Sequence, residues 1–227
     1  FEVSSLYQYR FKPKLKWLGV FAGLRMQSAL LPGNLVLKDD TNLAIAELDG
    51  AVTPDLATAQ KAYRLTDSFA PIMFKQFAGA LFKPLEKSWL TVDIKLGFGA
   101  NEVWVSRGLT VKDNKDTADT LELVRLQDFV EAGLELQVGL TGTAFDKILS
   151  YGLHAEVTVP FAEKTEVETD LSRAELISSA FKLTLGIKVF KWLALNYTLA
   201  VQRYPLIVDE WQVQGSLVLA VQANIVK

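Results

Sequence analysis

The feature that most constrains the fold is a strict alternation of apolar and polar side chains in the last fifth of the sequence. Between 181 and 189 the apolar positions are Phe181, Leu183, Leu185, Ile187 and Val189, and the residues between them are polar or small. The same alternation recurs over 193–202 and 212–225. A period of two residues is that of a β-strand with two unlike faces, and it argues against an amphipathic helix. These segments predict three long consecutive strands.

The alternation extends over the rest of the chain in six further segments. We expect these strands at about 1–12, 18–27, 68–82, 90–101, 130–140 and 153–159, with the least regular pattern in 68–82. Nine strands in 227 residues are consistent with one β domain covering 1–227. The connections alternate short and long, and the long loops are expected at about 32–65, 106–120 and 161–174. Within the first of these, Thr53, Pro54 and Asp55 predict the start of a short helix that ends near Tyr63.

Composition narrows the class of protein. Half of the residues are hydrophobic and the mean hydropathy is +0.19, yet no stretch approaches the roughly 20 apolar residues of a membrane-spanning helix. An antiparallel up-and-down transmembrane β-barrel explains both facts, because each strand mixes lipid-facing apolar residues with lumen-facing polar ones. The absence of cysteine excludes a disulfide framework, and a net charge of -2 gives no reason to expect nucleic acid as a partner.

The alternation alone does not say which face is inside. A soluble sandwich or a lipocalin-like barrel would turn the apolar face inward. We favour the membrane alternative, because the strands are longer than the five or six residues usual in soluble sheets and match a span of about 9–11 residues. The polar face is then a lumen. Its predicted charged residues are Arg10, Arg25, Asp93, Lys95, Glu131, Glu135, His154, Glu156, Lys182 and Lys188.

The mixed charge of this face predicts an interior of ion pairs in place of a selectivity filter of one sign. His154 is the only histidine and shares its face with Ser150 and Glu156. Four residues along a strand separate Ser150 from His154 by about 13 Å, whereas a nucleophile and its base need about 2.6–3.2 Å. One histidine among scattered carboxylates also lacks the ligand spacing of a metal site. We therefore predict no enzyme, no metal and no cofactor, and the glycines of 96–102 are expected to make room for neighbouring side chains.

Tryptophans mark both ends of the predicted strands. Trp17, Trp89 and Trp192 each follow a short connection, and Trp104 and Trp211 lie beside the longer loops. Aromatic residues at both rims are typical of the girdles that meet lipid headgroups. The first three have the parity of the polar face, which also fits a cap on the floor of the lumen.

Several phrases of the sequence carry a family resemblance: SSLYQYRFKPKL, LTDSFAPIMFKQFAGALFKP, LTVDIKLGFGANEVW and KWLALNYTLAVQRYP. Over most of its length the chain resembles a family of bacterial outer-membrane β-barrels catalogued only as a domain of unknown function. The resemblance implies an outer-membrane location in a Gram-negative bacterium and further strands before Phe1, for a total of 10–12. It implies no active site. The ending Val226-Lys227 departs from the aromatic last residue common in such barrels.

Two further expectations concern strand number and function. Single-chain bacterial barrels have an even number of strands, so nine visible strands predict an odd number from elsewhere. We expect a structural or partner-binding element of the cell envelope that contacts outer-membrane lipid and, through its long loops, other envelope proteins. A narrow porin-like channel for small solutes is the alternative, and a membrane enzyme that uses His154 is a third.

Overall fold

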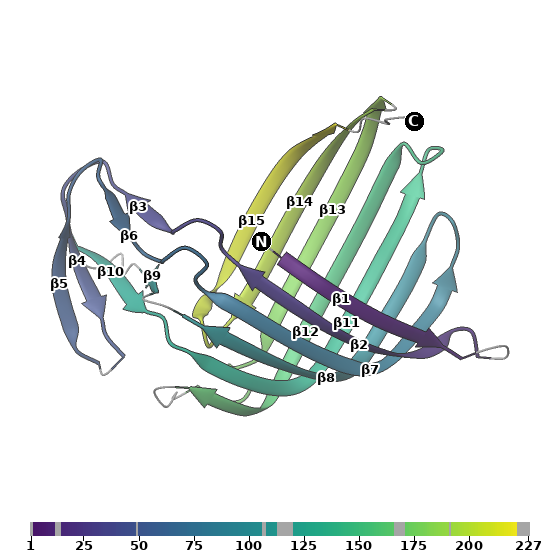
Figure 1. Cartoon of the computed structure of the whole chain (residues 1–227), viewed down its shortest axis with the longest axis horizontal. Coiled ribbons are helices and arrows are strands. Elements are labelled where there is room, and N and C mark those ends of the chain that lie inside the picture. Colours follow the sequence, from purple (N-terminus) through teal and green to yellow (C-terminus); the bar gives the residue numbers. More distant parts are fainter. Residues whose placement is uncertain are drawn as a thin grey trace.

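The computed structural model of the chain describes residues 2–11, 15–48, 50–105, 108–112, 120–165, 171–190 and 192–221. Within these residues the chain forms fifteen strands and no helix, so the fold is all-β (Figure 1). The strands belong to three sheets of nine, four and two strands.

The nine-stranded sheet is an antiparallel meander in which each strand pairs with the next main strand along the chain. Its strands are β1 (Glu2–Arg10), β2 (Leu18–Ser28), β7 (Ile72–Glu86), β8 (Thr91–Trp104), β11 (Phe129–Ala144), β12 (Leu149–Thr165), β13 (Ser178–Phe190), β14 (Leu193–Tyr204) and β15 (Val208–Val221). These nine strands confirm the number read from the alternation. β1 and β15 are the edges and do not pair with each other within the described residues, so the sheet is an open, curved wall (Figure 1).

Ion pairs across the sheet show how strongly it curves. Arg25 on β2 and Glu156 on β12 are separated by β7, β8 and β11, so in a flat sheet their backbones would be about 19 Å apart. Their side chains nevertheless come within 3.7 Å. The face that carries these charges is therefore the concave face.

The two faces have the opposite polarity to those of a soluble sheet. On the concave face Glu135 is 2% exposed, whereas its neighbours on the convex face, Leu134 and Leu136, are 44% and 42% exposed. At the β15 edge Leu219 is 62% exposed. Lys182 is also exposed, because it lines an open part of the concave face. A dry aliphatic centre with a charged exterior, which is the soluble alternative, is not what the sheet shows.

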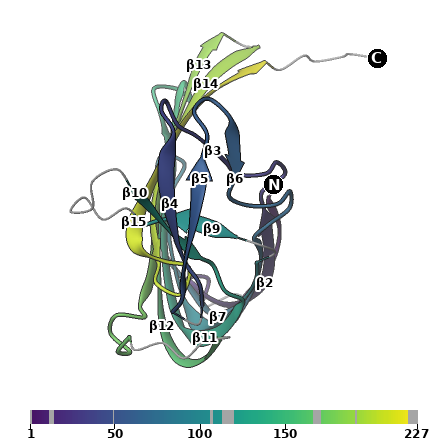
Figure 2. The same ribbon diagram turned by 90° about the vertical axis from the view of Figure 1, so that its left-hand side faces the viewer.

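The first two long connections fold together into what we call the accessory sheet, β4 (Thr41–Ala46), β5 (Val52–Ala57), β9 (Leu109–Val111) and β10 (Thr120–Arg125). Its order is β5-β4-β10-β9, and β4 and β10 are parallel although they come from different connections. A dry core of Leu43, Ile45, Ala57, Leu109 and Leu123 holds the four strands. A two-stranded antiparallel sheet of β3 (Asn34–Val36) and β6 (Ala62–Arg64) lies beside it (Figure 2).

The helix predicted from Thr53 to Tyr63 is wrong. Thr53, Pro54 and Asp55 lie in strand β5, where Pro54 pairs with Ala44. Proline and an early acid favour a helix start, but β5 is an edge strand, and at an edge proline does not break the ladder. Burial of Ala57 in the accessory core therefore outweighs the local helix signal.

The boundaries of other elements also differ from those expected. β7 continues through a bulge between Phe82 and Leu85 to Glu86, beyond the end of the strand predicted over 68–82. The loop predicted over 32–65 contains four strands, and the loop predicted over 106–120 contributes β9. β12 continues to Thr165 into the third loop, while 113–119, 166–170 and the ending Val226-Lys227 lie outside the described residues.

Polar contacts reinforce the accessory sheet where β5 meets β6 of the two-stranded sheet. The Tyr63 hydroxyl donates a hydrogen bond of 2.7 Å to Asp55, and the Leu56 amide donates one of 2.8 Å to the same carboxylate. Both bonds lower the pKa of Asp55. Burial, together with the bond to Asp55, raises the pKa of Tyr63 to about 12.

These shifts predict how the accessory sheet responds to pH. The raised pKa of Tyr63 gives stability that is present below pH 10 and is lost as pH rises from about 10 to about 12. The lowered pKa of Asp55 gives stability that is lost as pH falls below its ordinary value. In Asp55→Asn the pKa of Tyr63, followed by NMR of ¹³C-labelled tyrosine, should fall toward 10. An unchanged pKa in this variant would mean that Asp55 does not set it.

Candidate functional site

The concave face contains a buried ion-pair network centred on Lys75 of β7. Its ammonium lies 2.8 Å from Glu135 of β11 and donates a hydrogen bond to Glu156 of β12. Arg25 of β2 reaches the same Glu156 at 3.7 Å and Glu2 of β1 at 3.7 Å. Five strands therefore meet at one cluster. Buried carboxylates require such partners, because an unpaired charge in a low-dielectric interior is costly.

Glycines of β8 make this arrangement possible. Lys75 and Glu135 lie on strands that flank β8, and a side chain at Gly99 would collide with the Glu135 carboxylate. Gly97 lies opposite both Gly79 and Glu135 in the ladder. The absence of side chains at Gly97 and Gly99 therefore lets the two charges meet over the intervening strand.

A second group of polar contacts surrounds the network. Asn101 donates a hydrogen bond of 3.2 Å to Glu131, and Lys95 lies 3.3 Å from Asp93 and 3.5 Å from Gln137. One oxygen of Glu131, Oε2, is buried without a hydrogen-bond partner among the described residues. Arg25 Nε, Glu135 Oε2 and His154 Nε2 of the Lys75 network are likewise buried without a hydrogen-bond partner in the described part of the chain, although Glu135 Oε2 lies 2.8 Å from the Lys75 ammonium.

Two apolar clusters border the charged layer. Val103, Phe129, Leu176 and Leu206 form one of them at the end of the sheet where the long connections lie. Phe21, Phe77 and Leu81 form the other, and the Phe77 ring lies 5.9 Å from the Arg25 guanidinium. The polar layer therefore lies between two dry layers, which limits its contact with water.

A cavity of about 600 Å³ opens on the side of the network that faces the sheet edges. It is lined by polar groups of β1 and β2 on one side and of β12 to β15 on the other. These include Arg25, His154, Glu156, Lys182 and Tyr204. Because the lining carries both signs of charge, the cavity resembles a mixed polar interior more than a filter of one sign.

The structure places the ten predicted lumen residues in four environments. Arg25, Glu135, His154 and Glu156 belong to the Lys75 network or touch it, and Asp93, Lys95 and Glu131 lie in the polar contacts beside it. Lys182 lines the cavity and is exposed. Arg10 and Lys188 lie near the short turns, where Arg10 pairs with Glu86 at 2.6 Å.

Ser150 and His154 have different partners in the structure. The Ser150 hydroxyl donates a hydrogen bond of 3.2 Å to the Gly186 carbonyl, while His154 Nε2 lies 3.6 Å from Glu156. Serine, histidine and carboxylate are thus not joined as a catalytic relay. Among the described residues no group of His, Cys, Asp and Glu is arranged to hold a metal ion.

Lys75, the centre of the network, is not singled out by the sequence. β7 carries apolar residues on both faces, among them Phe74 and Phe77, so its alternation is too weak to assign a face. The ladder supplies what the pattern lacks, because Lys75 pairs with Arg25 on one side and with Asn101 on the other. Once β2 and β8 are aligned with β7, the polar residues opposite Lys75 assign its side chain to the concave face.

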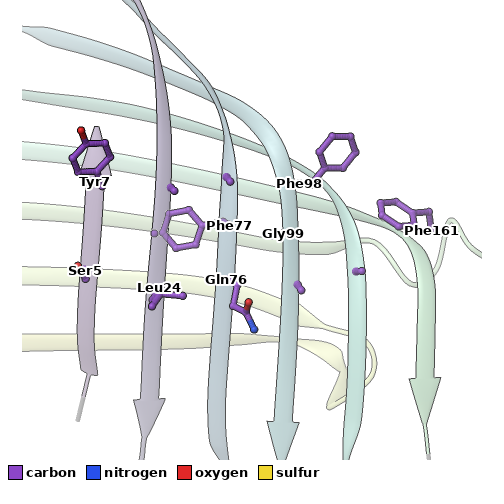
Figure 3. Close-up of a pocket in the computed structure, with 13 residues that line it drawn as sticks. Ser5, Tyr7, Leu24, Gln76, Phe77, Phe98, Gly99 and Phe161 are labelled. Atoms are coloured by element: carbon purple, nitrogen blue, oxygen red, sulfur yellow. The ribbon is translucent and has the colours of Figure 1, made fainter. Parts of the chain in front are cut away.

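The convex face has a shallow groove of about 600 Å³ (Figure 3). Its floor consists of alanines from four neighbouring strands, and its sides are Tyr7, Leu24, Phe98 and Phe161. Phe98 and Phe161 meet edge to face with ring centroids 6.2 Å apart. Such a groove suits an apolar environment and contains no charged side chain in its lining.

Comparisons with protein families, with curated proteins and with solved structures find no match for this chain. The family resemblance noted in the sequence therefore stays a prediction. In the described part of the chain, no helix is long and apolar enough to cross a membrane.

The network makes a prediction about stability. Lys75→Met leaves Glu135 and Glu156 buried with fewer partners, so we expect a loss of about 3–5 kcal/mol in the free energy of unfolding. Urea titration of the protein in detergent micelles measures this value. Lys188→Met is the matched control, because Lys188 is exposed and should tolerate the change within about 0.5 kcal/mol. Equal losses in both variants would contradict the central role of Lys75.

Proposed function

We propose that the chain forms the wall of an antiparallel transmembrane β-barrel in a bacterial outer membrane, where it is a non-enzymatic structural or partner-binding element. The observation that carries this proposal is the reversed polarity of the nine-stranded sheet. Apolar side chains on the convex face are exposed, whereas carboxylates and ammonium groups on the concave face are buried. Lipid, and not water, is the solvent in which that arrangement is favourable.

Strand length supports the same proposal. β7, β8, β11 and β12 have 15, 14, 16 and 17 residues. A tilted strand needs about 9–11 residues to cross a bilayer, so each is long enough to span it and to extend beyond it. In a bilayer the open edges at β1 and β15 need partner strands, because unpaired backbone groups are costly in hydrocarbon. The 10–12 strands implied by the family resemblance would close the sheet.

The accessory sheet supports the partner-binding part of the proposal. It has its own dry core and is built from the connections at one end of the wall (Figure 1). Arg125 and Glu47 pair within it, with Nη2 donating a bond of 3.0 Å, so its strands are held by more than the backbone ladder. An ordered unit at the mouth of a barrel is suited to contacting another envelope protein.

Substitution of an exposed leucine tests membrane insertion. Leu136 lies midway along β11 and is 42% exposed. Leu136→Arg should destabilise the protein in lipid vesicles by about 2–4 kcal/mol, as expected for arginine at the bilayer midplane. In a soluble protein the same change at an exposed site would cost within about 0.5 kcal/mol. Val52→Arg, at an exposed site of the accessory sheet, is the control that should remain neutral.

A narrow channel is the second candidate function, and the polar cavity of about 600 Å³ favours it. The ion-pair network favours a closed interior, so we expect no discrete conductance steps from the full-length protein in planar bilayers. Steps whose charge selectivity changes in Lys182→Glu, a residue of the cavity lining, would instead support the channel. Loss of the conductance steps in Lys182→Glu, with unchanged insertion of the protein into the bilayer, would also support the channel.

A further inference from the structure

The four short turns of the main sheet share a pattern that the proposed function does not use. Each has, in the turn or in the strand beside it, an exposed lysine within two residues of an exposed aromatic side chain. The pairs are Lys16 and Trp17, Lys87 and Trp89, Lys147 and Phe145, and Lys188 and Phe190. We call these eight residues, together with Trp192, which is also exposed, the turn rim.

Stacking holds part of the aromatic surface of the turn rim in place. Phe190 stacks on Trp192 with centroids 5.6 Å apart and planes at 11°, and Trp17 stacks on Phe82 at 6.2 Å. Trp17, Trp89 and Trp192 remain about half exposed. Half-exposed, ordered indole rings at the ends of membrane strands are suited to the boundary between hydrocarbon and headgroups.

The four turns lie at the same end of the sheet, because each connects two consecutive antiparallel strands (Figure 1). Neighbouring turns are about 10 Å apart, so an anion midway between two turns lies about 5 Å from each, within the screening length of about 8 Å at physiological salt. None of the four lysines forms an ion pair with another described residue. Arg10, at the same end of the sheet, is instead neutralised by Glu86. In the described turns the acids are Glu86 and Asp146.

The opposite end of the sheet has the opposite charge. Segments 29–71, 105–128, 162–177 and 205–210, which join the strands there, contain eighteen acidic and nine basic residues in the sequence. The turn rim is therefore a local positive surface on a chain whose net charge is -2. This difference in charge between the two ends favours an anionic ligand at the turn rim and disfavours a cationic one.

We infer that the turn rim is a binding surface for anionic phospholipid headgroups, with the lysines on the phosphate groups and the aromatic rings beside the upper acyl chains. The inference rests on the proposed membrane insertion and adds a lipid preference and a fixed end to it. Lysines near an anionic surface attract it strongly enough to enrich such lipids locally. The acidic end of the sheet disfavours the same lipids.

Quenching of tryptophan by brominated lipids tests this surface. Of the five tryptophans in the 227 residues, the double variant Trp104→Phe, Trp211→Phe keeps only Trp17, Trp89 and Trp192 of the turn rim. In phosphatidylcholine vesicles, brominated phosphatidylglycerol should quench it about twofold more than an equal fraction of brominated phosphatidylcholine. In about 1 M salt, where the screening length is about 3 Å, the preference should disappear.

Two fourfold variants separate the turn rim from net charge. Changing Lys16, Lys87, Lys147 and Lys188 to glutamine should abolish the preference. The same change at four exposed lysines of the other end, Lys38, Lys61, Lys112 and Lys164, should leave it intact. Loss in both variants would overturn the inference, because net charge alone would then explain the preference.

The quenching experiment distinguishes a wrong lipid preference from a wrong membrane location. Equal quenching by the two brominated lipids would overturn the inference while leaving membrane insertion supported. Absence of quenching by either lipid would contradict insertion itself, and the inference would fall with it.

Discussion

The structure depends on the pairing of charges buried on its concave face. Lys75 lies between Glu135 and Glu156, and Arg25 adds a second positive charge to the same site. Carboxylates that are almost inaccessible to solvent require such partners. The network links β1, β2, β7, β11 and β12, so it also fixes the curvature that brings distant strands together. Without the network, burial of the charged residues on the concave face would be energetically unfavourable.

This constraint accounts for the opposite character of the convex face. With the charged groups directed inward, the remaining side chains of each strand form an exposed surface of leucine, valine and phenylalanine. In the function that we propose, this surface contacts the bilayer, whose thickness the strand lengths match. The two ends of the sheet then acquire different roles: an ordered, acidic accessory sheet at one end and a basic aromatic rim at the other. The second role stands as our inference from the turns.

The strands of the main sheet and their two faces could be predicted from the sequence, because the two-residue alternation recurs in each of them. A period of two residues yields nine strands, and the positions of Glu135 and Leu136 on opposite faces follow from it directly. The alternation could not reveal the accessory sheet, because β4 and β10 are parallel strands from connections about 80 residues apart, and such pairing leaves no local signal. Pro54 illustrates the difficulty, since its helix signal is overridden by its position at a sheet edge. Lys75 was hidden for a similar reason, because the face of β7 becomes clear only from its neighbours in the ladder.

The central claim is that the convex face contacts acyl chains and the concave face does not. The chain has no cysteine, so single cysteines can be placed along β11 from position 133 to 138 and spin-labelled in lipid vesicles. Accessibility to oxygen, which concentrates in hydrocarbon, and to a water-soluble nickel chelate distinguishes the two environments. The account predicts high oxygen accessibility at 134, 136 and 138 and low values at 133, 135 and 137. High nickel accessibility at 134, 136 and 138 would place that face in water and contradict the account.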